Sequence, residues 1–330
     1  MASFDLATFW AGVIAFAILI YVILDGYDLG VGMLFGMTRD EERRDSMVAS
    51  IAPFWDGNET WLIVVGASLF GAFPAVYSVF LAAFYLPVLL LLVALIFRGV
   101  AFEFRERTVE GRWIWDTGFV VGSTLAAFVQ GAAIGAMIRG IPVTDGQFSG
   151  GPLDWLAPFP VFCGIGLVIG YALLGACWLV LKSKGELRDW AYRRIPWLVA
   201  GMIIVLIAAI LATLDIRDRI ESHIIGKNLA IILPIVAVLA LGGVLITAHK
   251  RWDTMPFLFA ALFFIAAYLT LAVLFWPYMI PYSITVENAA APQQSLEFMF
   301  YAGIVVLPVI IFYTATVYYV FRGKLGRGYS

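Results

Sequence analysis

Residues 7–36 read ATFWAGVIAFAILIYVILDGYDLGVGMLFG, an apolar run of 30 residues whose only charged side chains are Asp25 and Asp28. A membrane-spanning helix needs about 20 predominantly apolar residues. This run is therefore long enough to cross a bilayer and must tilt or project from it. Charged side chains are expensive at bilayer depth and are usually retained there for a role. The two aspartates thus suggest that the first span is also a functional segment.

Apolar runs of similar length recur along the whole chain of 330 residues, which is 62% hydrophobic and 13% charged. Soluble domains carry about 25% charged residues. The runs are too long and too uniform to alternate as barrel strands do, so helices are expected. We predict an all-α polytopic membrane protein, a helical bundle with nine transmembrane helices in a single integral membrane domain over residues 1–330. The predicted spans are 7–36, 52–72, 74–104, 113–138, 157–181, 196–215, 228–248, 255–279 and 298–321.

The distribution of basic residues predicts the orientation. Of the 21 Lys and Arg residues, 16 lie in the segments after the odd-numbered spans or at the C-terminus, and Arg98 lies within the third span. The opposite side holds the remaining four, Arg139, Arg217, Arg219 and Lys227. Because cytoplasmic loops carry the excess of Lys and Arg, the N-terminus is expected outside and the C-terminus in the cytoplasm. The first run is too long for a secretory signal peptide and has no basic leader.

Five carboxyl groups lie in or beside the first three runs. They are Asp25, Asp28, Asp56, Glu59 and Glu103. The predicted topology places all five in the cytoplasmic half of the membrane, where three helices could supply them to one site. The spacing of three residues within each of the first two pairs puts the members on one helical face. Two carboxylates so close in a low dielectric disfavour joint ionisation, and such a pair can hold and pass a proton.

Structural roles for the same residues remain open as alternatives. Asp28 could hydrogen-bond a neighbouring helix, and Asp56 with Asn58 could cap the second span. Glu103 lies close to several arginines, and its role could be limited to pairing with them at the membrane surface. Arg98 is either a partner for one of the acids or a side chain that extends to the interface.

The chain offers few ligands for a redox cofactor. Its two histidines, His223 and His249, fall in or at predicted loops, and no metal-ligand or nucleotide-binding spacing occurs. Cys163 and Cys177 share one span and lie about 21 Å apart at ~1.5 Å per residue, so they cannot form a disulfide. No metal is expected, and the net charge of −2 gives no reason to expect nucleic acid as a partner. Redox cofactors, if the protein uses them, are expected on another chain.

Four motifs carry a resemblance to a known family. DGYDLGVG at residues 25–32, SIAPFWDGNETWL at 50–62, FRGVAFEFR at 97–105 and VLPVIIFYT at 306–314 resemble subunit II of the cytochrome bd-type quinol oxidases. The resemblance covers the whole chain. The short chain with compact outer loops is similar to the cyanide-insensitive branch, although subunit II alone does not establish inhibitor sensitivity.

The resemblance implies a heterodimer in the bacterial cytoplasmic (inner) membrane. Haem-bearing subunit I carries haems b and d, while subunit II has no haem ligands of its own, scaffolds its partner and is not catalytic alone. The complex oxidises quinol and reduces dioxygen to water with protons from the cytoplasm, which generates a proton gradient without pumping. Small accessory subunits, and a structural quinone in subunit II, are left open by the sequence.

The resemblance also assigns roles by motif position. Asp56 and Glu103 match acids on a proton path, and Asp25 and Asp28 match the paired acids of the first helix. Trp61 matches a residue that lines an oxygen passage. Glu59 is a proton-transfer candidate, and Arg98 a candidate acid partner, on the residues alone and not by resemblance. Phe54 stands where some relatives have His. From the residues alone, a proton-coupled secondary transporter and a pure assembly scaffold remain alternatives.

Overall fold

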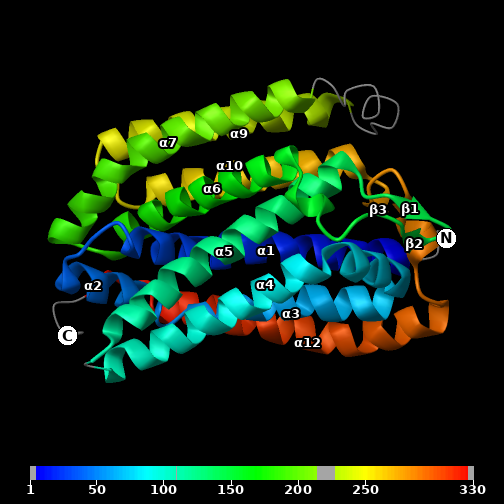
Figure 1. Ribbon diagram of the computed structural model, residues 1–330, viewed down its shortest axis with the longest axis horizontal. Helices are drawn as coiled ribbons and strands as arrows, with labels where there is room; N and C mark the ends of the chain where they lie inside the picture. The colour runs from blue at the N-terminus through cyan, green and yellow to red at the C-terminus, as the bar shows by residue number, and fades with distance from the viewer. Residues whose placement is uncertain (1–4, 109, 214–226, 326–330) are drawn as a thin grey trace.

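The computed structural model describes residues 5–108, 110–213 and 227–325. Its long helices run side by side in an elongated bundle (Figure 1). They are α1 (Leu6–Phe35), α3 (Trp55–Ala72), α4 (Pro74–Arg107), α5 (Arg112–Arg139), α6 (Pro158–Lys182), α7 (Gly185–Thr213), α9 (Lys227–His249), α10 (Met255–Phe275) and α12 (Gln293–Val320). The prediction of an all-α polytopic membrane protein is confirmed.

Short elements connect the long helices. They are α2 (Glu41–Ile51), the 3-10 helix η1 (Asp154–Leu156), α11 (Val286–Ala289), and the antiparallel hairpins of β1 (Val143–Thr144) with β2 (Gln147–Phe148) and β3 (Tyr278–Ile280) with β4 (Ile284–Thr285). Asp40 caps α2 by accepting a hydrogen bond from the backbone N–H of Arg43 at 3.0 Å. We call the end of the bundle that carries α2 the α2 end, and the opposite end the hairpin end (Figure 1).

Eight helices in the described part of the chain are long and apolar enough to cross a membrane, namely α1, α4, α5, α6, α7, α9, α10 and α12. The predicted second span corresponds to α3, whose 18 residues begin inside the polar motif WDGNET and which is not one of the eight. Residues 214–215 of the predicted sixth span lie outside the described residues, as do His223, Arg217, Arg219 and Arg327.

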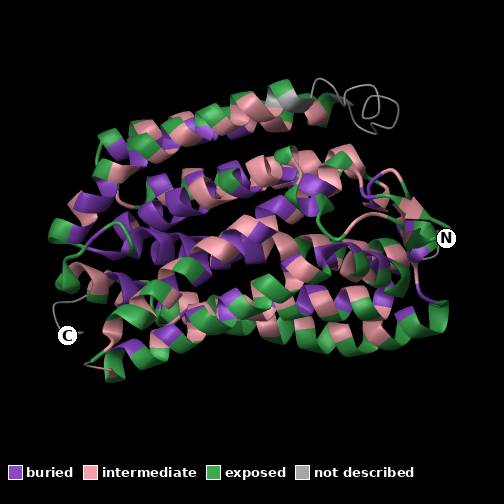
Figure 2. Cartoon of the chain, in the orientation of Figure 1, coloured by how far each residue is buried: buried purple, intermediate pink, exposed green. Residues whose placement is uncertain are grey.

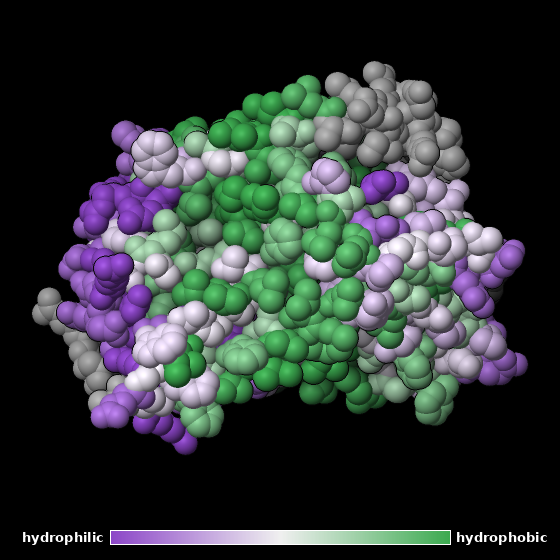
Figure 3. All heavy atoms as spheres, viewed as in Figure 1, coloured by the Kyte–Doolittle hydropathy of each residue, from purple (hydrophilic) through white to green (hydrophobic). Residues whose placement is uncertain are grey.

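The surface has the polarity that a bilayer requires. In the view of Figure 3, hydrophobic side chains form a band across the middle of the bundle, and hydrophilic ones gather at the two ends. Figure 2 shows that burial is greatest along α1 and α6 and least along α12, whose only buried residue is Leu296. The helices that carry the acidic motifs therefore lie against a densely packed centre, while α12 presents most of its length outward.

Close contact between α1 and α6 depends on glycine. A Cβ atom at Gly30 would overlap the carbonyl oxygen of Tyr171, and one at Gly175 would overlap the backbone of Gly30. At Gly26 the added atom would lie 2.8 Å from the Tyr171 ring. The glycines of the DGYDLGVG motif thus let a second helix approach the acidic segment, as small residues do at membrane helix interfaces.

We expect Gly30→Ala to destabilise the protein, because the new methyl group forces α1 away from α6. Inserting one carbon into a well-packed contact costs about 1–3 kcal/mol of unfolding free energy. The midpoint of thermal unfolding of the purified complex measures the effect. Gly242→Ala in α9 is the control, since its Cβ would meet nothing within 4 Å. Equal midpoints for the two variants would contradict the proposed role of this contact.

An ion pair and a backbone hydrogen bond hold the segment after α12 against the α2 end. Lys324 forms an ion pair with Asp253 in the turn between α9 and α10, and the backbone N–H of Leu325 donates to the carbonyl of Lys182 at 2.8 Å. Partial burial acts to raise the pKa of the Asp253 carboxyl, but hydrogen bonds from Lys324 and from the Tyr192 hydroxyl at 2.8 Å outweigh it, so this pKa is lowered. The carboxylate therefore stays ionised at neutral pH.

We expect Asp253→Asn to release the C-terminal segment, so that trypsin cleaves after Lys324 several-fold faster than in the wild type at pH 7.5. Because the folded-state pKa is lowered, the carboxylate stabilises the fold above its usual pKa of 3.8 and loses that contribution only as pH falls through the lower folded value. Protection in the wild type should thus be constant across neutral pH. Glu186→Gln, which removes a pair with Arg43 instead, should leave the cleavage rate unchanged.

Candidate functional site

Three helices bring four charged side chains together inside the bundle. The Arg98 guanidinium of α4 lies 2.7 Å from Glu59 of α3, and 3.5 Å and 3.9 Å from Asp25 and Asp28 of α1. Both aspartates and Arg98 are fully buried, whereas the Glu59 side chain is 25% exposed. We call these four residues the Arg98 cluster. Arg98 is thus an ion-pair partner of acids rather than a side chain that extends to the interface.

The charges of the Arg98 cluster do not balance. Three carboxyl groups face one guanidinium, so full ionisation would leave two negative charges uncompensated in a buried site. Removing ions from water costs several kcal/mol each, and attraction repays this cost only where charges are paired and hydrogen-bonded. Arg98 lies 3.5 Å from the Asp25 carboxylate, beyond a normal hydrogen bond, and the Tyr21 hydroxyl also interacts with this carboxylate. The cluster is therefore suited to holding an exchangeable proton, a property that packing alone does not require.

Asn58 connects the Arg98 cluster to α12. Its side-chain amide donates to Asp28 at 2.6 Å, to the Tyr27 hydroxyl at 3.1 Å and to the carbonyl of Leu24 at 3.2 Å. In turn the Tyr318 hydroxyl of α12 donates to the Asn58 carbonyl oxygen at 3.0 Å and lies 2.5 Å from the Tyr27 hydroxyl. Asn58 therefore orients Asp28, and α12 orients Asn58.

The role of these hydrogen-bonding residues was not evident in the sequence. The sequence suggests Asn58 only as a helix cap, but α3 begins after Phe54 without a side-chain cap and the amide points inward instead. Tyr27 lies within the DGYDLGVG motif, so its position between the two aspartates was the available signal. Tyr318 had none, because it contacts Asn58 across 260 positions of sequence.

Asp56 and Glu103 do not join the Arg98 cluster. Asp56 is exposed in the first turn of α3, and its carboxylate forms no ion pair with a described residue. Glu103 is 60% exposed and lies 3.5 Å from Arg107. Five residues separate Glu103 from Arg98, which at 3.6 residues per turn rotates the two side chains to different faces of α4. The five carboxyl groups therefore do not form one site. Asp25, Asp28 and Glu59 lie together in the Arg98 cluster, and Asp56 and Glu103 lie at the surface.

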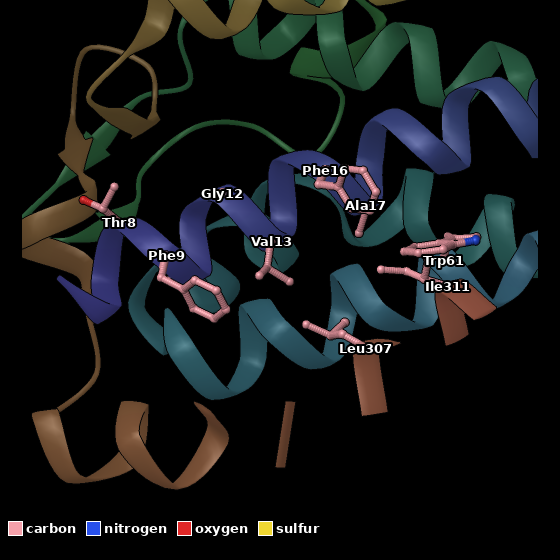
Figure 4. Close-up of a pocket in the computed structure, with 9 residues that line it drawn as sticks. All are labelled: Thr8, Phe9, Gly12, Val13, Phe16, Ala17, Trp61, Leu307 and Ile311. Carbon is pink, nitrogen blue, oxygen red and sulfur yellow. The ribbon is translucent and has the colours of Figure 1, made fainter. Parts of the chain in front are cut away.

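Trp61 lines a separate apolar cavity of about 400 Å³ between α1, α3 and α12 (Figure 4). The Trp61 side chain is buried and meets Phe16 edge to face, with ring centroids 5.8 Å apart. Leu307 and Ile311 of α12 also line the cavity, and Ile311 lies beside Trp61 (Figure 4). The lining contains almost no polar surface, so the cavity suits a small apolar molecule or a hydrocarbon chain.

Among the described residues, no group of three or more His, Cys, Asp or Glu side chains is arranged to hold a metal ion. Cys163 and Cys177 are both free thiols on α6.

Comparison with known proteins identifies the family. Residues 6–321 match the family described as cytochrome bd terminal oxidase subunit II. The chain belongs to this family. The resemblance seen in the sequence motifs is confirmed, and with it the expectation that the chain is a subunit of an oxidoreductase complex. Membership in this oxidase family favours the oxidase hypothesis over the transporter.

The similarity to individual relatives extends over nearly their whole length. The chain is 29% identical to cytochrome bd-I ubiquinol oxidase subunit 2 of Escherichia coli strain K12, over 99% of this chain and 97% of that protein. It is 28% identical to cytochrome bd ubiquinol oxidase subunit 2 of Bacillus subtilis strain 168, over 96% of each. The solved bd oxidase of Geobacillus thermodenitrificans contains a chain with the same fold, at a TM-score of 0.76 and 15% identity, covering 96% of this chain and 98% of that one.

We expect Arg98→Gln to destabilise this subunit strongly, because it leaves three carboxyl groups around a site without a cation. Removing one partner of a buried ion pair costs about 3–5 kcal/mol of unfolding free energy. The yield of assembled complex and its thermal midpoint measure the loss. Arg98→Lys keeps the charge but not the planar fork, so it should recover part of the stability.

Arg107→Gln is the matched control for this experiment, since it removes an exposed pair with Glu103. Exposed pairs contribute about 0–1 kcal/mol. If Arg98→Gln were as stable as Arg107→Gln, the Arg98 cluster would not hold α1, α3 and α4 together.

Proposed function

We propose that this chain is the haem-free subunit II of a heterodimeric quinol:oxygen oxidoreductase, in which it scaffolds haem-bearing subunit I and supplies carboxylates for proton uptake from the cytoplasm. The observation that carries the proposal is the buried Arg98 cluster, whose three carboxyl groups share one guanidinium. The names of the relatives support quinol as the electron donor, since two of them are ubiquinol oxidase subunits. On this proposal the chain is not catalytic by itself, and haems b and d belong to subunit I.

The proposed topology has nine spans in a single membrane domain of the bacterial inner membrane, with the N-terminus outside. We count α3 as the ninth span because it lies against α1 and α12 within the bundle (Figure 1). The α2 end is then cytoplasmic, since the arginines that follow α1, α4 and α6 lie there. Alternation of nine helices puts the two termini on opposite sides.

We propose that subunit I covers the face formed by α3, α4 and α12. Asp56 is exposed on this face beside a helix that presents most of its length outward. A carboxylate facing lipid is costly, whereas at a protein interface it can be hydrated and paired. Proton transfer from Asp56 and Glu103 then leads across the interface toward the haem-bearing subunit.

The Arg98 cluster acts on this path as a neighbouring proton store. Glu59 is its partly exposed member and lies one helical turn along α3 from Asp56. A proton that leaves Asp56 can be replaced through Glu59, while Asp25 and Asp28 set the charge that Glu59 experiences. In this arrangement the Asp25 and Asp28 pair contributes both to helix packing and to proton relay.

We further propose that dioxygen reaches the complex through the apolar cavity beside Trp61. Its lining favours an apolar gas over water. The same lining could hold the tail of a lipid or of a structural quinone, and these are the alternatives that a structure of the complete complex would distinguish.

We expect Asp56→Asn to slow quinol oxidation at least about tenfold with haem content unchanged, because an amide cannot carry the proton and acid–base groups typically contribute 10²–10⁴-fold. Steady-state oxygen consumption by the purified complex between pH 6 and pH 8 measures the effect. Asp145→Asn, in the β1–β2 turn at the hairpin end, is the matched control and should turn over normally. Wild-type rates for Asp56→Asn across this pH range would remove Asp56 from the path and leave a pure scaffold as the better description.

A further inference from the structure

A second cavity lies at the α2 end, on the side of the bundle opposite α12. It measures about 410 Å³ and lies between α7 and α9. Its polar lining comes from Arg193, His249, Arg251 and Tyr192, and its apolar lining includes Pro196 and Leu245. No carboxylate lines it. The cavity is therefore basic on one side and apolar on the other.

The basic side chains around this cavity outnumber the acids available to them. Asp189 pairs with Arg251 at 2.5 Å, Asp253 with Arg188 at 3.3 Å, and Glu186 with Arg43 at 2.5 Å. All three acidic side chains of the surrounding turns are thus already engaged. Arg193 and Lys250 form no ion pair with any described residue, and both are exposed. The surplus positive charge faces outward at the rim.

Beyond the apolar side of the cavity, the exposed surface of α7 and α9 is apolar. Exposed aliphatic side chains follow α7 and α9 toward the hairpin end, among them Ile204 and Ile207 on α7 and Leu239 and Ile246 on α9. Trp197, one turn after Arg193, is 79% exposed, and Trp252 is 51% exposed. Exposed tryptophans of this kind lie at the level of the lipid headgroups.

We propose that this cavity binds the phosphate of an anionic phospholipid, with Arg193 as its principal contact and the acyl chains along the exposed apolar surface of α7 and α9. Basic pockets between membrane helices at the cytoplasmic side are suited to such headgroups. The fork of an arginine can donate two hydrogen bonds to one phosphate. A soluble phosphate would use the basic rim but not the apolar surface of α7 and α9, whereas a lipid uses both. The site lies on the opposite side of the bundle from α12 (Figure 1).

The test uses the purified, delipidated oxidase complex and native mass spectrometry of bound lipid. It compares dioleoyl phosphatidylglycerol with dioleoyl phosphatidylcholine, each with and without excess inorganic phosphate. The wild type should retain a phosphatidylglycerol molecule that phosphatidylcholine does not replace. Arg193→Gln should weaken its binding about fivefold, since one basic side chain near an anionic surface contributes about that factor.

Arg39→Gln is the matched control, because Arg39 is an exposed arginine at the α2 end that lines neither cavity. It should leave phosphatidylglycerol binding unchanged. If Arg193→Gln does not assemble with its haems, Lys250→Gln provides the same test from the neighbouring turn. Equal affinity for the two lipids, equal loss in the Arg39 control, or displacement of the lipid by inorganic phosphate would each overturn the proposal.

Discussion

The contact of one guanidinium with three carboxyl groups determines how the first third of the chain is arranged. Arg98 is fully buried, and its partners come from α1 and α3. A buried cation must have its partners close, so α4 can adopt only the rotation that faces Arg98 toward α1. The same contact fixes α3 through Glu59. A close glycine contact on another face of α1 holds α6. Ion pairs with Arg98 therefore fix α1 on one side, and tight backbone packing fixes it on the other.

The elements of the fold follow from sequence because long apolar runs have few structural alternatives in lipid. The residues that form the site are harder to predict from the sequence. Which acids converge depends on the rotation of each helix about its axis, and spacing within one helix does not determine that rotation. The pairs of Asp25 with Asp28 and of Asp56 with Glu59 look alike in sequence, yet the first is buried together while the second divides between the surface and the cluster. α3 shows the limit for span counting, because its polar first turn lowers its apolar content.

The bundle separates its functions by side. Acids and the apolar cavity lie toward α3 and α12, whereas surplus arginine and exposed tryptophan lie toward α7 and α9. If subunit I covers the first side and lipid the second, as proposed above, each face meets the surroundings that its charges favour. This division leaves α1 and α6 as the shared centre on which both faces are built.

The hydrogen bond from Tyr318 to Asn58 has a consequence for how the protein is made. The residues of the Arg98 cluster are synthesised within the first hundred positions, but Tyr318 follows Asn58 by 260 positions. Until α12 enters the membrane, Asn58 can hold Asp28 but is not itself held. While the helices between α4 and α12 are synthesised, the cluster must therefore exist in a looser state, and insertion of α12 completes it. The buried charges of the first helices thus reach their final arrangement only after a helix far along the chain has inserted.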